Sequence, residues 1–504
     1  MYEIDRRSIC TYRFCLGFLI IVDLINRARD LVVHYSDYGV LPRSALIEKF
    51  TTTSLSWSFH LLSGEWYFQA VLFFIAGVFA LGLMIGYQTR LCAFASWLLL
   101  VSLHYRNHMV LNGGDVMLRM LVFWAIFMPS FSFLNDEKEK RSGFDQLRSD
   151  IWYIAMALQL VWLYWSSAVL KSEQFWVIDK SAIYYALHID QFVTPLGIWL
   201  RQHLKLMEGF TVITYYLEEV GPFLLFVPFF GSFFRSFVCF AFIGFHLLGL
   251  ALTMELGLFP WICSVAWLVF IPSWVWDHCL IPGYSKMNQV FNFGMILSTF
   301  RKVRERVLEL FEIKYTGSFF QSKLAKETQV AVLLFFMVYV GLWNVRETNF
   351  ARWEKYFPTS LNWIGRLFHI DQKWDMFAPN PLLDDGWYVI AGELMNGKKV
   401  DLIRGTIGDV SFEKPELVSA TYKNQRWRKY MMNLWLQDNS GHRLYLSEYL
   451  TRKWNHNKAI LDQLKKFTIY YMREDTPPPG EAFAPVEKIE VWNHYCIEQD
   501  IPKP

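Results

Sequence analysis

Long apolar stretches recur through about the first 350 residues of this chain and constrain its fold more than any other feature. An α-helix rises 1.5 Å per residue, so about 20 apolar residues cross the roughly 30 Å hydrocarbon core of a bilayer. We therefore predict a mostly α fold, a polytopic membrane helix bundle with about eight or nine spans. The candidate spans are residues 11–29, 66–86, 91–106, 115–134, 151–170, 211–230, 233–253, 257–276 and 328–345.

The composition agrees with a bilayer as the solvent and excludes other classes. The chain is 54% hydrophobic and 19% charged, whereas soluble domains carry about 25% charged residues. A formal net charge of only +3 argues against nucleic acid as a partner. The seven cysteines are scattered without a C-x-x-C pair or zinc spacing, so no metal is predicted and the redox compartment stays open.

The first apolar stretch is predicted to be a span rather than a signal peptide. Arg6, Arg7 and Arg13 precede or begin it, but it continues to about Ile25 without a small-residue cleavage site. Alternate loops are rich in Lys and Arg, including Arg90 and Arg235. The positive-inside rule then places the N-terminus in the cytoplasm and the C-terminal domain on the other side.

The composition changes near residue 346 and predicts two domains. Residues 1–346 would form the bundle, including a connector at about 277–327 that is either an amphipathic helix on the membrane surface or a solvated link. Residues 347–504 would form a soluble α+β domain. In it we expect a hairpin at 386–404 with an Asn-Gly turn, helices at 426–436 and 448–466, a strand at 466–472 and a Pro-rich loop at 476–485.

Polar residues inside the predicted spans must face the bundle interior, because lipid offers them no partner. Arg119, Glu218 and His246 are the examples. A further polar group surrounds a Gly-Gly pair and contains His104, Asn107, Asn112, Asp115 and Arg119. Its simplest interpretation is a capped helix start, with Arg119 as the i+4 partner of Asp115. The alternative is a substrate or cofactor pocket.

Lys171 ends an apolar helix at the predicted outer interface, where it is either a snorkelling lysine or a partly desolvated general base. His246 lies inside a predicted helix with Glu255 at its outer end, and together with Gly257 and Pro260 they suggest a shaped cavity. A membrane histidine can also simply bond to a backbone carbonyl. Trp374 and Phe377 follow the last span and are predicted either to anchor the domain at the headgroups or to fold back as a lid over Lys171.

Several long motifs together resemble one family. The segments LHYRNHMVLNGGDVMLRMLVFW, YWSSAVLKSEQFW, YYALHIDQFVTPLG, GFHLLGLALTMELGLFPW and KWDMFAPNPLLDDGWYV occur in this order. They resemble bacterial proteins of the horizontally transferred transmembrane domain family, which are homologues of the vitamin K-dependent gamma-carboxylase. The resemblance covers most of residues 8–275 and continues into the C-terminal domain.

The resemblance implies a chemistry and assigns residues to it. In the carboxylase a lysine deprotonates vitamin K hydroquinone, which reacts with O2 to give a strong base and finally an epoxide; the base lets a glutamate capture CO2. AVLKSEQFW is similar to the segment of that lysine, so Lys171 would be the base, and GFHLL places His246 at the family's histidine. The implied cofactors are a reduced quinone (vitamin K or menaquinone hydroquinone), O2 and CO2. The implied partners are the bilayer of a bacterial inner membrane and an exported protein or peptide.

Two alternatives remain open at this point. The chain could be a non-enzymatic membrane maturation or assembly factor whose soluble domain binds an exported partner. It could also be a small-molecule transporter, although it contains no inverted repeat or pair of broken helices of the kind that transporters use. Where the animal enzyme has an Asn-His pair this chain has Phe131-Ser132, which favours quinone epoxidation over glutamate carboxylation as the retained reaction.

Overall fold

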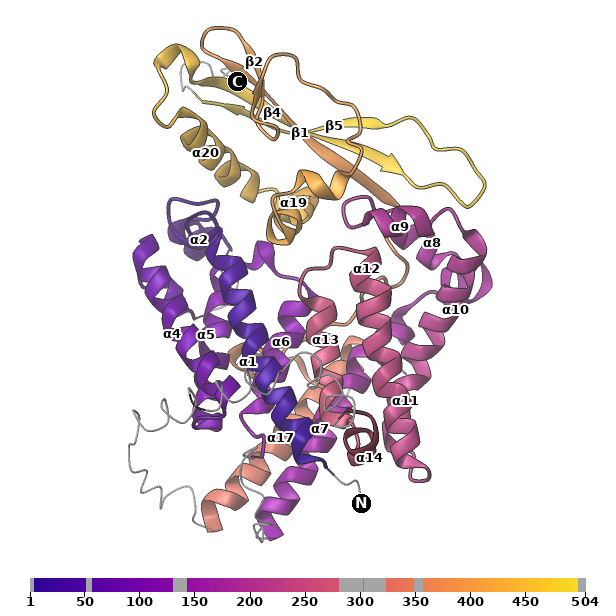
Figure 1. Cartoon of the computed structure of the whole chain (residues 1–504). Helices are drawn as coiled ribbons and strands as arrows, with labels where there is room; N and C mark the ends of the chain where they lie inside the picture. The colour runs from indigo at the N-terminus through magenta and orange to yellow at the C-terminus, as the bar shows by residue number, and fades with distance from the viewer. Residues whose placement is uncertain are drawn as a thin grey trace.

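A computed structural model of the chain describes residues 4–50, 57–129, 143–280, 302, 323–348 and 357–496. It consists of a helical bundle with a five-stranded sheet at one end, and α1 (Arg6–Ala28) begins at the opposite end (Figure 1). The predicted connector at 277–327 lies mostly outside the described residues.

The bundle contains helices of unequal length. Its principal helices are α1 (Arg6–Ala28), α4 (Trp66–Ile85), α5 (Thr89–Arg106), α6 (Gly113–Ala125), α7 (Gly143–Leu170), α10 (Leu204–Val220), α11 (Gly231–Gly244), α13 (Phe259–Trp267) and α17 (Lys323–Glu347). Shorter helices are α2 (Leu31–Tyr35), α3 (Arg43–Ala45), α8 (Ala182–Leu187), α9 (Pro195–Leu200), α12 (Ala251–Thr253), α14 (Ser273–Val275) and α18 (Asn362–Phe368).

Among the described residues, five helices are long and apolar enough to cross a membrane. They span Arg6–Ala28, Trp66–Ile85, Gln146–Leu170, Gly231–Thr253 and Lys326–Glu347, and the pair Phe259–Phe270 and Ser273–Leu280, bent by 101°, would make a sixth. The other predicted spans, 91–106, 115–134 and 211–230, overlap α5, α6 and α10, the last two only in part. At 13 residues, α6 is about 20 Å long, too short to cross a bilayer by itself. The structure therefore supports a membrane bundle with fewer long helices than the sequence predicts.

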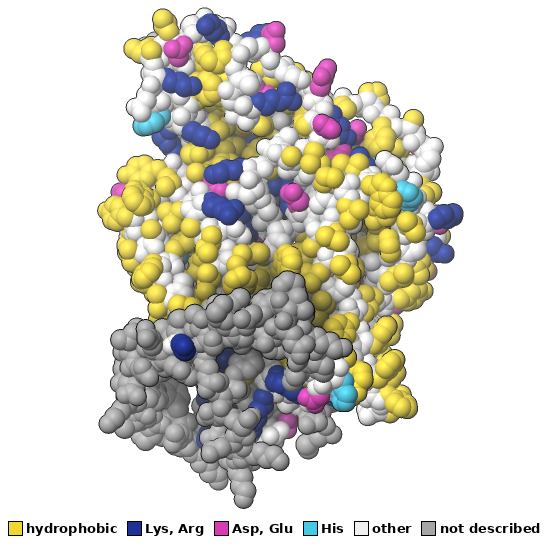
Figure 2. All heavy atoms as spheres, in the orientation of Figure 1, with side chains coloured by type: hydrophobic (Ala, Val, Ile, Leu, Met, Phe, Trp, Pro, Cys, Tyr) yellow, Lys and Arg dark blue, Asp and Glu magenta, His cyan; other side chains and the backbone are white. Residues whose placement is uncertain are grey.

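Apolar side chains remain on the outside of the bundle, as a lipid solvent requires. Figure 2 shows them around its middle, while charged side chains gather over the sheet domain. Phe74 of α4, Phe233 of α11 and Leu248 are 72%, 66% and 70% exposed. A water-soluble protein would not display so many large apolar groups over several adjacent helices.

The C-terminal unit is an antiparallel sheet in the order β3-β2-β1-β4-β5. Its strands are β1 (Asp384–Leu394), β2 (Lys399–Asp401), β3 (Thr406–Ile407), β4 (Leu464–Asp475) and β5 (Glu487–Tyr495). Helices α19 (Gln425–Trp435) and α20 (His442–Asn455) lie between this sheet and the bundle (Figure 1).

The predicted hairpin, the helix at 426–436, the strand at 466–472 and the Pro-rich loop are confirmed. The hairpin turn contains Gly397 with φ of +81°, a conformation that suits glycine. The helix predicted at 448–466 is wrong in part, because α20 ends at Asn455 and Asn457 adopts φ of +56° before β4 begins at Leu464. The edge strand β5 is an element that the sequence analysis did not predict.

Candidate functional site

A cavity of about 980 Å³ lies inside the bundle and reaches the C-terminal domain. Its walls come from α7, α8, α9, α10, α11 and the start of α13, and from two later parts of the chain, the segment 375–382 and helix α19. Most lining side chains are apolar. A few polar ones gather in it, and they include Lys171 and His246.

Lys171 follows the last residue of α7 and is not a snorkelling lysine, because its side chain is only 2% exposed. Its Nζ donates a hydrogen bond to the carboxylate of Glu218 on α10. The ammonium also lies 4.0 Å from the centre of the Trp176 ring, in the π-helical turn Gln174–Ile178. Burial lowers the pKa of Lys171 from its ordinary value, and the Glu218 carboxylate opposes that shift.

Glu218 is a member of this site that the sequence analysis placed in the bundle interior without giving it a partner. It is 8% exposed and lines the same cavity as Lys171. The signal in the sequence is a carboxylate within an apolar helix, which needs a cation or a donor. The pair carries no net charge, so it can be buried at a lower cost than either ion alone.

His246 lies in a π-helical turn, Phe245–Leu250, that continues α11. Such turns add one residue per helical turn and often occur at functional sites. The Nε2 atom of His246 is 2.7 Å from the Tyr164 hydroxyl, which accepts a hydrogen bond of 3.1 Å from Trp267 Nε1. Because the Tyr164 oxygen accepts a hydrogen bond from Trp267, the Tyr164 hydroxyl can donate its own hydrogen to His246 Nε2. In a neutral imidazole the ring proton then lies on Nδ1. Nδ1 is buried without a hydrogen-bond partner in the described structure, and His246 lines the cavity.

The segment after the last span folds back over this region, as predicted. The backbone N–H of Ser172 donates to the Pro379 carbonyl at 2.7 Å, and the Ser167 hydroxyl donates to the Met376 carbonyl at 3.3 Å. Phe377 lines the cavity together with Lys171. Trp374 does not line it: this side chain is 1% exposed, packs in the bundle core and donates to Gln372 at 2.7 Å.

Asn112 and Asp115 form a reciprocal cap at the start of α6. The Asn112 side chain accepts from the backbone of Gly114 and Asp115, and the Asp115 carboxylate accepts from the Asn112 backbone at 2.8 Å. A side chain at Gly114 would come within 3.1 Å of the Phe259 backbone, so it would fit only if the start of α13 shifted. Asn112 and Gly113 also line the cavity, so the capped helix start and the pocket are parts of one structure.

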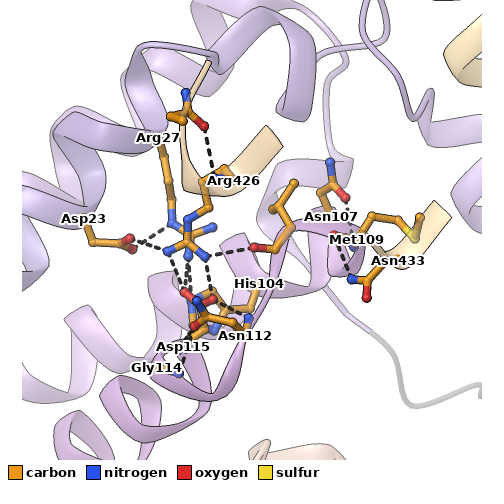
Figure 3. Close-up of polar contacts among 12 residues, drawn as sticks. Asp23, Arg27, His104, Asn107, Met109, Asn112, Gly114, Asp115, Arg426 and Asn433 are labelled. Carbon is orange, nitrogen blue, oxygen red and sulfur yellow. Dashed lines mark hydrogen bonds and ion pairs between the residues drawn. The ribbon is translucent and has the colours of Figure 1, made fainter. Parts of the chain in front are cut away.

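Asp115 belongs to a buried ionic network that joins the bundle to the C-terminal domain (Figure 3). Arg27 pairs with Asp23 at 2.7 Å and with Asp115. Arg426 of α19 reaches Asp23 at 2.7 Å and Asp115 Oδ1 at 2.8 Å. His104 Nε2 lies 3.7 Å from Asp115 at the side of the network.

The predicted pairing of Arg119 with Asp115 is wrong. Arg119 points away and donates to the Asp371 carbonyl at 3.0 Å, because Arg27 and Arg426 already occupy the carboxylate. Asn107 does not line the cavity either. It caps the short 3₁₀ turn His108–Val110 and donates to the His34 carbonyl at 3.0 Å.

Asp23, His104 and Asp115 have potential metal-ligand atoms within 4.8 Å of one another. Both carboxylates are bonded to Arg27 and Arg426, however, so two guanidinium groups already balance the two negative charges. Glu255 lies at the far side of the cavity wall, 54% exposed, and pairs with Arg428 of α19 at 3.2 Å.

No protein-family model, curated protein or solved structure matches this chain.

Proposed function

We propose that this chain is a membrane-embedded enzyme that binds a lipid-soluble reduced quinone in the cavity and uses Lys171 to transfer a proton. The observation that carries the proposal is a lysine buried in an apolar cavity and hydrogen-bonded to a carboxylate. A lysine with a lowered pKa is a usable general base near neutral pH. The motifs that resemble the gamma-carboxylase family contain both Lys171 and His246.

The residues of the cavity fit a quinone. A quinone is a flat apolar ring with two oxygens and a hydrocarbon tail, so it needs a large apolar pocket with a few polar groups. Lys171 and the unpartnered Nδ1 of His246 are suited to hold its oxygens. A reduced quinone with O2 would supply a strong base for removing a proton from carbon, which Lys171 cannot do alone.

The chain's own part in such a reaction is proton handling and exclusion of water. Lys171 accepts a proton, and Glu218 stabilises the ammonium that results. Trp176 favours the same charged state through its ring face. The segment from Asp375 to Asn380 covers the site on the side of the C-terminal domain, which limits the access of water to a strong base.

The proposal also includes the orientation of the chain in the membrane and the number of crossings. Helices α1, α5, α7 and α11 carry Arg7, Arg90, Arg148 and Arg235 near their first turns. Arg90 and Arg148 both bond to Gln329 of α17, at the end opposite the sheet. We infer that this end faces the cytoplasm of a bacterium and that the sheet domain faces outside. α5, α10 and the bent pair Phe259–Phe270 and Ser273–Leu280 would bring the number of crossings to eight. Quinone epoxidation is the proposed reaction, and carboxylation of an exported protein with CO2 is its most specific extension.

The direct test is to purify the full chain, extract its lipids and measure quinones by mass spectrometry. We expect a menaquinone or its epoxide at a substantial fraction of one per chain, and less in His246→Ala than in the wild type. A preparation without quinone that also fails to bind added menaquinol saturably would contradict the proposal. A secreted protein in the same preparation, without quinone, would instead favour an assembly factor.

A further inference from the structure

One face of α19 covers the domain end of the cavity. Gln425, Arg428, Lys429 and Met432 all line it, and their spacing of i, i+3, i+4 and i+7 places them on the same side of a helix. The fit is close: Gly257, with φ of +65°, has the Gln425 side chain 3.0 Å from the position that a side chain would take. The helix therefore packs directly against the bundle at this point.

This face brings more positive than negative charge to the cavity. The side chain of Arg428 is 2% exposed and forms an ion pair with Glu255, whose side chain is 54% exposed. Lys429 is partly buried, and no carboxylate of the described residues lies within 4.0 Å of its ammonium. Burial lowers the pKa of Lys429, and the more distant Asp115 carboxylate, which already pairs with Arg27 and Arg426, opposes that shift. One positive charge at this end of the cavity is therefore not matched by a close carboxylate.

The cavity is also open towards the outside of the bundle along apolar side chains. Trp199 of α9, Ile213 of α10 and Leu248 line it, yet they are 53%, 61% and 70% exposed. On a membrane protein, exposed apolar side chains on neighbouring helices face lipid. An elongated ligand can thus lie partly in the cavity and partly in the surrounding bilayer.

We propose that the domain end of this cavity binds the phosphate of an anionic phospholipid on Lys429 and Arg428, with its acyl chains along Trp199, Ile213 and Leu248. The inference goes beyond the proposed quinone chemistry and does not depend on it. A phosphate supplies the negative charge that Lys429 lacks. The acyl chains match the exposed apolar side chains that line the open side of the cavity, whereas a soluble anion has no group to place there. A phospholipid therefore matches both the charged and the apolar parts of the site.

The test is titration of the full chain in neutral detergent with phosphatidylglycerol and phosphatidylcholine, followed by native mass spectrometry. We expect phosphatidylglycerol to bind about fivefold more tightly, because one cation near a membrane surface attracts an anionic lipid by roughly 1 kcal/mol. Lys429→Gln should reduce this preference to less than about twofold. The control, Lys398→Gln, removes the same charge from the exposed β1–β2 turn and should leave the preference unchanged.

Equal binding of the two lipids by the wild type would overturn the proposal, as would an unchanged preference in Lys429→Gln. Glycerol phosphate, which has the head but no acyl chain, distinguishes the source of the anion. We expect no displacement of the lipid at millimolar glycerol phosphate, and full displacement would identify a soluble-anion site instead. If the wild type bound no quinone but kept its preference for phosphatidylglycerol, the proposed function would be rejected and the lipid site would stand.

Discussion

The molecule contains two buried sets of charged groups that differ in their surroundings. At the domain junction, Asp23, Arg27, Asp115 and Arg426 balance one another in two positive and two negative charges, and their side chains are at most 11% exposed. In the cavity, Lys171 and Glu218 face an open volume of about 980 Å³. The Nδ1 atom of His246 in the same cavity has no partner in the described structure.

This difference separates structural from chemical roles. A saturated network holds elements together, because each group that is removed leaves an uncompensated charge. A site that binds or transforms a ligand must retain groups that are free to make new bonds. We therefore expect changes in the junction network to lower stability and changes in the cavity to lower ligand binding or turnover.

The largest expected effect is on stability, in Arg426→Met. Methionine has a similar length but no charge, so Asp23 and Asp115 would share Arg27 alone. Breaking a buried ionic network in this way costs about 3–5 kcal/mol. Thermal unfolding in detergent measures the loss, and limited proteolysis should show earlier cleavage of the C-terminal domain. The control is Arg404→Met, because Arg404 is 45% exposed and such surface pairs contribute at most about 1 kcal/mol. Equal stability of the two variants would contradict the assigned role of the network.

Lys171→Arg should lower turnover and leave stability unchanged, the opposite of what we expect for Arg426→Met. Arginine keeps the positive charge beside Glu218 but cannot give up its proton near neutral pH, so the fold should remain while turnover falls by about 10²–10⁴-fold. Quinol-dependent oxygen uptake measures the turnover. The matched change in the network, Arg27→Lys, should lower the unfolding temperature and leave the turnover of the folded protein near that of the wild type. An active Lys171→Arg variant would show that Lys171 has a structural role and does not transfer a proton.

Local features of both regions could be predicted from the sequence, whereas distant pairings could not. The cap at Asn112, the interior position of Glu218 and the return of residues 373–381 to the mouth of the bundle follow from helix chemistry and chain length. Asp115 pairs with Arg27 and with Arg426, which is 311 residues away. Only the docking of α19 brings the two together, so the nearby Arg119 was the wrong choice.

The same limit applies to Lys171 and Glu218, which are 47 residues apart on two helices that pack together. Periodicity shows which face of each helix is apolar, but it does not show which residues of two packed helices lie at the same level along their axes. Of the eight or nine predicted spans, five or six correspond to helices that are long and apolar enough to cross a membrane, and the reason for the difference is related. Apolar composition does not distinguish a crossing helix from a short one that is buried among other helices, such as α6.

A third buried titratable site is Asp385 of β1, which lies where the sheet meets the α8–α9 loop. Gln191 donates to it from its side chain at 2.7 Å and from its backbone at 3.2 Å. Burial raises the pKa of Asp385 from 3.8 to about 7. Between these pH values the folded protein holds a proton that the unfolded chain releases, so this contribution to stability is full below about pH 4 and is lost as the pH rises through 7.

Asp385→Asn should therefore remove part of the pH dependence of unfolding. Asparagine is neutral at every pH and can still accept the side-chain bond from Gln191. The variant should gain on the order of 2–3 kcal/mol relative to the wild type between pH 5 and pH 8. Unfolding temperatures at the two pH values measure this difference. A parallel change in both proteins would mean that Asp385 takes up no proton in this pH range.

The smallest expected effect tests whether the cavity needs an oriented His246. In Tyr164→Phe the imidazole loses its 2.7 Å bond and can rotate, so we expect the Kd for menaquinol to rise about threefold to tenfold, corresponding to roughly 1 kcal/mol for one hydrogen bond. The change also leaves Trp267 Nε1 without its acceptor and lowers stability. Tyr12→Phe is the matched control, since Tyr12 is buried in the bundle and bonds to the Leu121 carbonyl at 3.1 Å outside the cavity. If both variants lost stability but neither lost affinity, the hydrogen bonds around His246 would belong with the saturated network, and the unpartnered Nδ1 would have no part in binding.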